Sequence, residues 1–137
     1  LDFADGFDGS GKKFVIVPYI HDMAAALSAS DLVVARAGAL TLAEITAKGL
    51  PSILVPHPNV PDDVQRRNAK AMQDKGASVS IEDSALDGAA LFEAISGLIA
   101  DDDRLACMGK AALALAMPDA ASKVADLAER QARRMNG

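Results

Sequence analysis

The alternation of short apolar runs with longer helical patterns constrains the fold of this chain more than any other feature. The apolar runs are rich in β-branched residues and lie at residues 14–17, 32–35, 52–55 and 78–81. Helical patterns lie at about residues 22–29, 40–48, 62–75, 87–99, 102–116 and 119–134. Strands that alternate with helices form parallel sheets, because each helix returns the chain to the same edge. The sequence therefore predicts an α/β fold, a Rossmann-like parallel sheet with helices on both faces.

The predicted elements also carry signals of burial and of helix ends. The runs at 32–35 and 52–55 are almost wholly apolar, which is typical of strands covered on both faces. Gly49 and Gly76 follow helical patterns and predict the left-handed residue that ends many helices. One side of the last helical pattern is apolar, and we expect it to face the body of the domain. That side comprises Ala121, Val124, Ala125, Leu127, Ala128 and Ala132.

Length and composition indicate one ordinary globular domain. The chain has 137 residues, of which 50% are hydrophobic and 24% are charged, as in a typical single domain. Residues 1–12 are rich in glycine and aspartate and predict a linker or loop, whereas residues 13–137 predict the domain itself. The first residue is Leu1 rather than methionine, so we expect the chain to have been cut from a longer one.

Charge, cysteine content and hydropathy exclude several classes of function. The formal net charge of −5 argues against nucleic acid as a partner, since binding phosphates needs a basic surface. The single cysteine, Cys107, forms no internal disulfide and is too few for a structural zinc site. No apolar run approaches the roughly 18–20 residues that cross a bilayer. We therefore expect a soluble intracellular chain that holds no metal.

The segment from Ala35 to Glu44 is the most informative, because it runs from a predicted buried strand directly into a helix. At the carboxyl end of a parallel strand, the free N–H groups that begin the next helix form an anion site. Gly38 lets the backbone approach an anion, and a diphosphate is the expected ligand. The alternative is structural: Thr41 and Glu44 have the spacing of a capping box, which satisfies free N–H groups with side chains.

A second candidate segment follows the next predicted strand, after a stiff proline-rich loop at residues 56–61. Gln65 and Asn68 lie three positions apart on the predicted helix and so share one face. Their amides are able to hydrogen-bond an uncharged polyol such as a sugar. The alternative is again structural, with Gln65 closing a capping box that begins at Asp62 and Asn68 on a solvated face.

The third candidate segment is the turn that follows the first predicted strand. Asp22 has the position of a helix N-cap. Tyr19 or Ile20, just before it, is suited to cover a flat base, although side-chain packing is the alternative. His21 and His57 stand alone, without the partners of a nucleophilic or acid–base set. The sequence therefore predicts no catalytic residue in this chain.

In this order, the three segments resemble the C-terminal, donor-binding half of the MurG family of N-acetylglucosamine transferases. The string ARAGALTLAEITAKGLPSILVPHPNVPDD at residues 35–63, followed by QRRNA, carries the resemblance. The similarity extends from about residue 13 to about residue 130. It implies that the chain is a truncated C-terminal half of a two-domain GT-B glycosyltransferase. In that architecture a UDP-sugar lies in the cleft between the domains and is held mainly by this half.

The resemblance also implies roles for single residues. The backbone of Ile20 would contact uracil, Glu44 would accept hydrogen bonds from the ribose, and Gln65 would contact the sugar hydroxyls. The helix start would hold the diphosphate, while Arg36 and Gly38 would shape the loop before it. The predicted substrate-binding set is Tyr19, Ile20, Arg36, Gly38, Ala39, Leu40, Thr41, Glu44, Gln65 and Asn68. Val64 departs from the family, which usually has a polar residue there.

The implied reaction is an inverting displacement in peptidoglycan synthesis. A hydroxyl of the muramoyl peptide, carried on undecaprenyl diphosphate, attacks the anomeric carbon of UDP-N-acetylglucosamine, and UDP leaves. The helix start and Thr41 would stabilise the diphosphate charge without a metal or a cofactor. Members of the family are peripheral proteins at the cytoplasmic face of the plasma membrane, and their N-terminal domain supplies the acceptor site and the general base. We therefore expect this chain alone to be inactive.

Two other functions stay open from the sequence. The first is a non-catalytic subunit that binds a nucleotide sugar and needs a separate partner chain for activity. The second is a structural fragment that associates with itself through the open edge of its sheet, where unpaired backbone groups are available.

Overall fold

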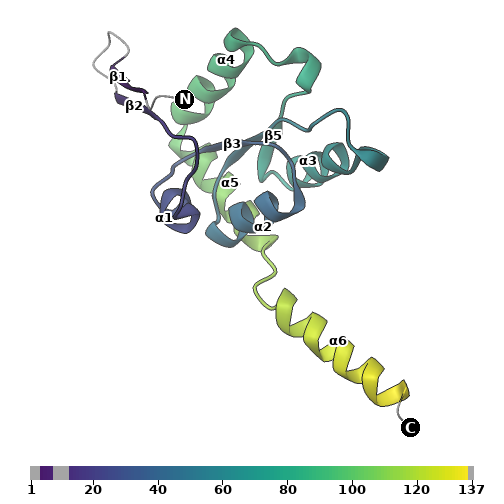
Figure 1. Cartoon of the computed structure of the whole chain (residues 1–137). Coiled ribbons are helices and arrows are strands. Elements are labelled where there is room, and N and C mark those ends of the chain that lie inside the picture. Colours follow the sequence, from purple (N-terminus) through teal and green to yellow (C-terminus); the bar gives the residue numbers. More distant parts are fainter. Residues whose placement is uncertain (1–3, 8–12, 136–137) are drawn as a thin grey trace.

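We describe a computed structural model of the chain over residues 4–7 and 13–135 (Figure 1). The strands are β1 (Ala4–Phe7), β2 (Lys13–Ile16), β3 (Val33–Ala35), β4 (Ser52–Leu54) and β5 (Ser78–Ser80). The α-helices are α1 (Met23–Ser28), α2 (Ala39–Lys48), α3 (Val64–Asp74), α4 (Gly88–Ile99), α5 (Asp102–Ala114) and α6 (Ala120–Met135). Two short 3₁₀ turns complete the description, η1 (Pro61–Asp63) and η2 (Asp83–Ala85).

The centre of the molecule is a parallel sheet of three strands in the order β3-β4-β5. Successive residues of a strand point to opposite faces, and both Ile53 and Leu54 of β4 are fully buried. Leu54 packs against residues of α2 and α3, whereas Ile53 packs against residues of α4 and α5. Helices therefore cover both faces of the sheet, which confirms the predicted fold class.

The two predicted buried strands differ in how well they are covered. All three residues of β4 are buried, as expected. Val34 of β3 remains 43% exposed, so the prediction that this strand is covered on both faces was wrong. Val34 is in register with Ile53 and faces the same side, and α4 and α5 cover the middle strand without extending over this edge strand.

The N-terminal strands form a separate antiparallel pair, in which Ala4 lies opposite Ile16. The first predicted strand therefore exists as β2, but it is not part of the parallel sheet. The prediction of a linker or loop over residues 1–12 is corrected at β1, while residues 1–3 and 8–12 lie outside the described residues. The sequence of β1, ADGF, contains no β-branched residue, so its extended form depends on pairing with β2.

The predicted helix signals are confirmed at three positions. The carboxylate of Asp22 accepts a hydrogen bond of 2.9 Å from the N–H of Ala25 and caps α1. Gly49 and Gly76 have φ angles of +64° and +74°. This left-handed conformation is costly for residues with a Cβ, which explains the glycines at these two helix ends.

Helix α6 extends away from the rest of the molecule (Figure 1). Val124 and Leu127 on its predicted apolar side are 65% and 64% exposed. The expectation that this side faces the body of the domain was therefore wrong. The segment between α5 and α6, with Met117 and Pro118, directs the helix outward instead of folding it back onto the sheet. Among the helices of residues 13–135, none combines the length and apolarity that crossing a bilayer requires.

Candidate functional site

The loops that follow β3, β4 and β5 lie at one edge of the sheet, because the three strands are parallel. Hydrogen bonds continue the strand pairing into these loops: the N–H of Val55 donates to the carbonyl of Ala35 at 2.9 Å, and the N–H of Ile81 donates to Leu54 at 3.0 Å. The first loop leads into α2, the second into η1 and α3, and the third into η2. This carboxyl edge is where open parallel sheets bind ligands.

The start of α2 offers free backbone donors at this edge. Gly38 is the N-cap residue, and no side chain among the described residues caps the helix there. The carbonyl of Gly38 accepts the first hydrogen bond of the helix, from the N–H of Leu42 at 3.0 Å. The N–H groups of Ala39, Leu40 and Thr41 precede that bond and have no partner within the helix. They form the kind of site that binds anions.

The capping-box alternative for α2 is contradicted by the position of the helix start. A capping box places its Ser or Thr at the N-cap, but here Thr41 is the third residue of the helix and Glu44 the sixth. Both side chains are half-buried. The Thr41 hydroxyl lies 3.8 Å from the position that a Cβ on Gly38 would take. Thr41 is therefore beside the free donors without capping the helix.

The loop after β4 is held by the side chain of Gln65. Its Oε1 accepts a hydrogen bond of 2.9 Å from the N–H of His57, and the N–H of Asn59 donates to Nδ1 of His57 at 3.1 Å. The alternative of a capping box formed by Asp62 and Gln65 was wrong, because Asp63 is the N-cap of α3 and its side chain makes no capping bond among the described residues. Gln65 fixes the loop in front of its helix instead.

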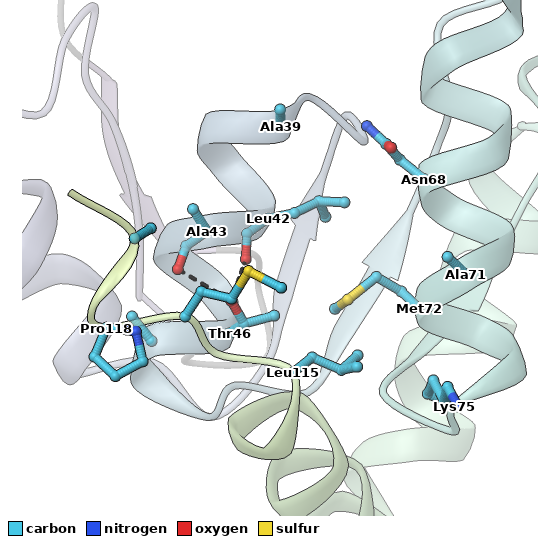
Figure 2. A pocket seen from close by; sticks show the side chains of 13 residues that line it. Ala39, Leu42, Ala43, Thr46, Asn68, Ala71, Met72, Lys75, Leu115 and Pro118 are labelled. Atoms are coloured by element: carbon cyan, nitrogen blue, oxygen red, sulfur yellow. Dashed lines mark hydrogen bonds between the residues drawn. The ribbon is translucent and has the colours of Figure 1, made fainter. Parts of the chain in front are cut away.

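Asn68 joins α3 to the loop that precedes α2. Its Nδ2 donates to the carbonyl of Ala37 at 3.0 Å, and the side chain is half-buried. Figure 2 shows the amide of Asn68 directed from α3 toward the strand-to-helix turn before Ala39. The alternative that placed Asn68 on a solvated face was therefore wrong. Gln65 and Asn68 do share a helix face, and this face holds both loops at the carboxyl edge.

Arg36 connects three loops at the carboxyl edge. Its Nη1 donates to the carbonyl oxygens of Val55 at 3.3 Å and Pro56 at 3.5 Å. The same nitrogen forms an ion pair with the carboxylate of Asp83. Sequence analysis did not identify Asp83, since it lies 47 residues from Arg36 and no local spacing connects the two.

Tyr19 and Ile20 lie apart from the other predicted binding residues, on the segment between β2 and α1. Tyr19 is 70% exposed, and its ring packs edge-to-face against His21, with centroids 5.1 Å apart. Among the described residues, no hydrogen bond or ion pair connects these two positions to the carboxyl edge. The other eight predicted residues lie on the loop after β3 and on the helices α2 and α3.

A cavity of about 590 Å³ lies between α2, α3 and the segment that follows α5 (Figure 2). Its lining is mostly apolar and includes Leu42, Met72 and Leu115. Of the predicted binding residues it includes Ala39 and Asn68, but neither Thr41 nor Glu44 nor Gln65. The cavity therefore adjoins the start of α2 at Ala39 but does not extend to Thr41, Glu44 or Gln65.

Metal ligation finds no support in side-chain placement over the described ranges 4–7 and 13–135. No group of three His, Cys, Asp or Glu residues within them is arranged to hold a metal ion. The donors at the start of α2 are backbone N–H groups, which bind anions rather than cations.

Comparison with known proteins connects this geometry to one family. Residues 3–131 match the model of the glycosyltransferase family 28 C-terminal domain. A relative from Desulforudis audaxviator, named UDP-N-acetylglucosamine--N-acetylmuramyl-(pentapeptide) pyrophosphoryl-undecaprenol N-acetylglucosamine transferase, is 42% identical over 96% of this chain and 37% of its own length. A relative of the same name from Exiguobacterium sibiricum is 48% identical over 87% of this chain and 32% of its own length.

A solved structure shows the same relationship in three dimensions. The crystal structure of Acinetobacter baumannii MurG superposes with a TM-score of 0.77 at 36% identity. It covers 83% of this chain, which in turn covers 33% of that protein. The chain therefore spans about a third of the length of the relatives that it matches.

Proposed function

The chain belongs to the family of glycosyltransferase family 28 C-terminal domains, and from this premise we propose that it binds UDP-N-acetylglucosamine for an N-acetylglucosamine transferase. The observation that carries the proposal is the start of α2, where backbone N–H groups at the carboxyl edge of the sheet have no side-chain cap among the described residues. An anion at this position gains hydrogen bonds and the positive end of the helix dipole. We assign residues 13–137 to the donor-binding domain.

The diphosphate and the ribose of the donor have candidate partners at this edge. The diphosphate would take the N–H groups of Ala39, Leu40 and Thr41, with Gly38 allowing close approach. The hydroxyls of the ribose would donate to Glu44, one helical turn further along α2.

The sugar and the base would use other segments. The Oε1 atom of Gln65 accepts a hydrogen bond from the N–H of His57. The amide nitrogen of Gln65 is a donor suited to a sugar hydroxyl. Tyr19 and Ile20, both exposed, would cover the uracil.

In the proposed reaction of the whole protein, a hydroxyl of the lipid-linked muramoyl peptide attacks the anomeric carbon of the donor. The bond from that carbon to the diphosphate breaks, and negative charge increases on the departing UDP. The backbone N–H groups fixed at the start of α2 would stabilise that charge in the transition state. The acceptor site and the general base would lie on another domain, so this chain alone would bind donor without transferring it. The whole protein would act peripherally at the cytoplasmic face of the plasma membrane.

Self-association is a second candidate property, favoured by the edge of the sheet. Within the described residues, β3 pairs with β4 on one side only, and Val34 is 43% exposed. Unpaired strand edges can pair with another chain. A concentration series in analytical ultracentrifugation tests this: a mass that stays monomeric across the series excludes self-association. A nucleotide-sugar-binding subunit with a separate partner chain would show the same donor binding as the proposed function.

The sharpest test of donor binding is the replacement Gly38→Ala. Gly38 has φ −71° and ψ 146°, which any residue adopts, and an added Cβ would meet Thr41 Oγ1 at 3.8 Å, an ordinary contact. We expect thermal stability to be retained, while calorimetry shows affinity for UDP-N-acetylglucosamine weaker by about tenfold or more, since the methyl group obstructs the anion.

Gly88→Ala is the matched control for this replacement. Gly88 is also at a helix start, that of α4, and an added Cβ there has no heavy atom within 4 Å. We expect donor affinity equal to that of the parent chain. Unchanged affinity in Gly38→Ala, or a parent chain that binds no donor, would contradict the proposed function.

A further inference from the structure

Two consecutive carboxylates after β5 hold two arginines that come from different parts of the chain. Glu82 accepts from Nε of Arg66 on α3 at 3.1 Å, and Asp83 pairs with Arg36 of the loop before α2. Strand β5 is hydrogen-bonded to β4 within the sheet. The turn that carries the two carboxylates is therefore anchored to the sheet and provides a fixed point for both arginines.

Arg36 is the more extensively bound of these two arginines. Its guanidinium group reaches the carbonyl oxygens of Val55 and Pro56 as well as the carboxylate of Asp83. A planar guanidinium group has several donors in a fixed arrangement, so it is able to bind partners on different loops at once. The side chain of Asp83 is 34% exposed and that of Arg36 48%. The pair is thus partly screened by water and contributes little to global stability.

The ion pair of Arg36 and Asp83 restricts the loop before α2, because of the position of Arg36 in the chain. Arg36 is two residues before Gly38, whose backbone orients the free N–H groups of α2. Glycine has wide backbone freedom, which a binding site must restrict at a cost in affinity. A side chain anchored two residues before the glycine removes part of that freedom before the ligand arrives. On the other side of the same loop, the Asn68 hydrogen bond to Ala37 has the same effect.

We propose that Asp83 is a positioning residue for the donor site: through Arg36 it fixes the loop before α2, and so orients the backbone N–H groups that bind a diphosphate. This inference rests on the proposed function, because the ligand is the diphosphate of the donor. It adds a residue that does not touch the ligand. It also assigns Arg36 to the loop rather than to the phosphate, since the charge of its side chain is matched by Asp83.

The test uses Asp83→Asn in the 137-residue chain, with Asp74→Asn as matched control. Asp74 is an exposed carboxylate whose ion pair with Lys70, at 2.7 Å, stays within α3. Binding of UDP and of uridine is followed by NMR titration, and hydrogen exchange of the backbone amides at residues 36–41 is measured without ligand. Asp83→Glu, which keeps the carboxylate, tests rescue.

For Asp83→Asn we expect UDP affinity weaker by about fivefold, the upper range for a partly exposed ion pair. Uridine affinity stays unchanged, because uridine has no diphosphate. The amides at residues 36–41 exchange faster, Asp83→Glu recovers most of the UDP affinity, and Asp74→Asn behaves like the parent. A merely structural role for Asp83 would lower thermal stability and weaken UDP and uridine binding alike.

Three further results would also overturn the inference. Unchanged exchange at residues 36–41 shows that Asp83 does not fix the loop, whether or not a nucleotide binds. UDP affinity equal to that of the parent shows that fixing the loop does not orient the backbone N–H groups of α2. Tighter UDP binding shows that Asp83 restrains an Arg36 that otherwise reaches the phosphate. A parent chain that binds neither UDP nor uridine instead removes the proposed function, and this inference with it.

Discussion

Helices α1 to α5 begin in two different ways. Helices α1, α4 and α5 each have an aspartate N-cap, Asp22, Asp87 or Asp101, whose carboxylate accepts a backbone N–H at 2.7–2.9 Å. Helices α2 and α3 have Gly38 and Asp63 as N-cap residues, and no side chain among the described residues caps either helix. The uncapped starts of α2 and α3 come after the loops that follow β3 and β4 at the carboxyl edge, whereas α5 follows α4 rather than a strand.

The difference indicates which helix starts serve only the fold. An aspartate cap stabilises a helix by about 1 kcal/mol, because it satisfies free N–H groups. The same carboxylate repels an anionic ligand and occupies its hydrogen-bond donors. Without a cap, α2 lacks that stabilisation, but its first backbone N–H groups stay available to a ligand. We therefore expect a side-chain cap on α2 to weaken binding of UDP-N-acetylglucosamine, and the cap on α5 to have no effect on it.

The largest expected effect comes from giving α2 the aspartate cap that α1, α4 and α5 have. In Gly38→Asp, the carboxylate would accept the free N–H groups and repel a diphosphate. We expect calorimetry to show UDP-N-acetylglucosamine affinity reduced by about a hundredfold or more, with thermal stability equal or slightly higher. Gly38→Asn, which caps without charge, should lose less affinity. Donor binding by Gly38→Asp at parent affinity would mean that the start of α2 is not the anion site.

A smaller effect is expected from removing a cap that serves only the fold. In Asp101→Ala, the N–H of Arg104 loses its acceptor, and urea denaturation should show a free energy of unfolding lower by about 1 kcal/mol. Donor affinity measured on the folded chain should not change, because α5 begins outside the carboxyl edge. A loss of donor affinity without unfolding would place α5 in the site and break the distinction between the two kinds of helix start.

The smallest effect is expected at the start of α3. Asp63 has φ +50° and makes no side-chain cap, so glycine relieves a left-handed aspartate but removes a negative charge near the helix start. For Asp63→Gly we expect the free energy of unfolding to change by less than about 0.5 kcal/mol. A loss of about 1 kcal/mol in urea denaturation, as large as at Asp101, would show that Asp63 caps α3 after all.

Local sequence signals predicted most of the elements and several of their ends. The pattern of β-branched runs located β3, β4 and β5 within about one residue, and Gly49 and Gly76 marked two helix ends because a positive φ favours glycine. The same signals failed where two local interpretations shared one spacing. The Thr41 and Glu44 spacing fits a capping box, but it does not specify where the helix begins, and the helix begins at Ala39.

Contacts between distant residues could not be predicted from spacing. The pairs Arg36 with Asp83 and Asn68 with Ala37 join residues 47 and 31 positions apart. The apolar side of α6 was also misjudged, because its pattern indicates that a surface can be buried without saying what buries it. Val124 and Leu127 accordingly remain exposed in the chain as described here.

The sequence by itself determined most of the segments that form strands and helices, though not β1, because periodicity, glycine and helix-capping chemistry act over a few neighbouring residues. Only the tertiary structure decided that the α2 start is uncapped, that Gln65 and Asn68 hold loops rather than water, and that Asp83 anchors Arg36. The physical reason is that these side chains find their partners across the sheet, where parallel strands bring loops together that are far apart along the chain.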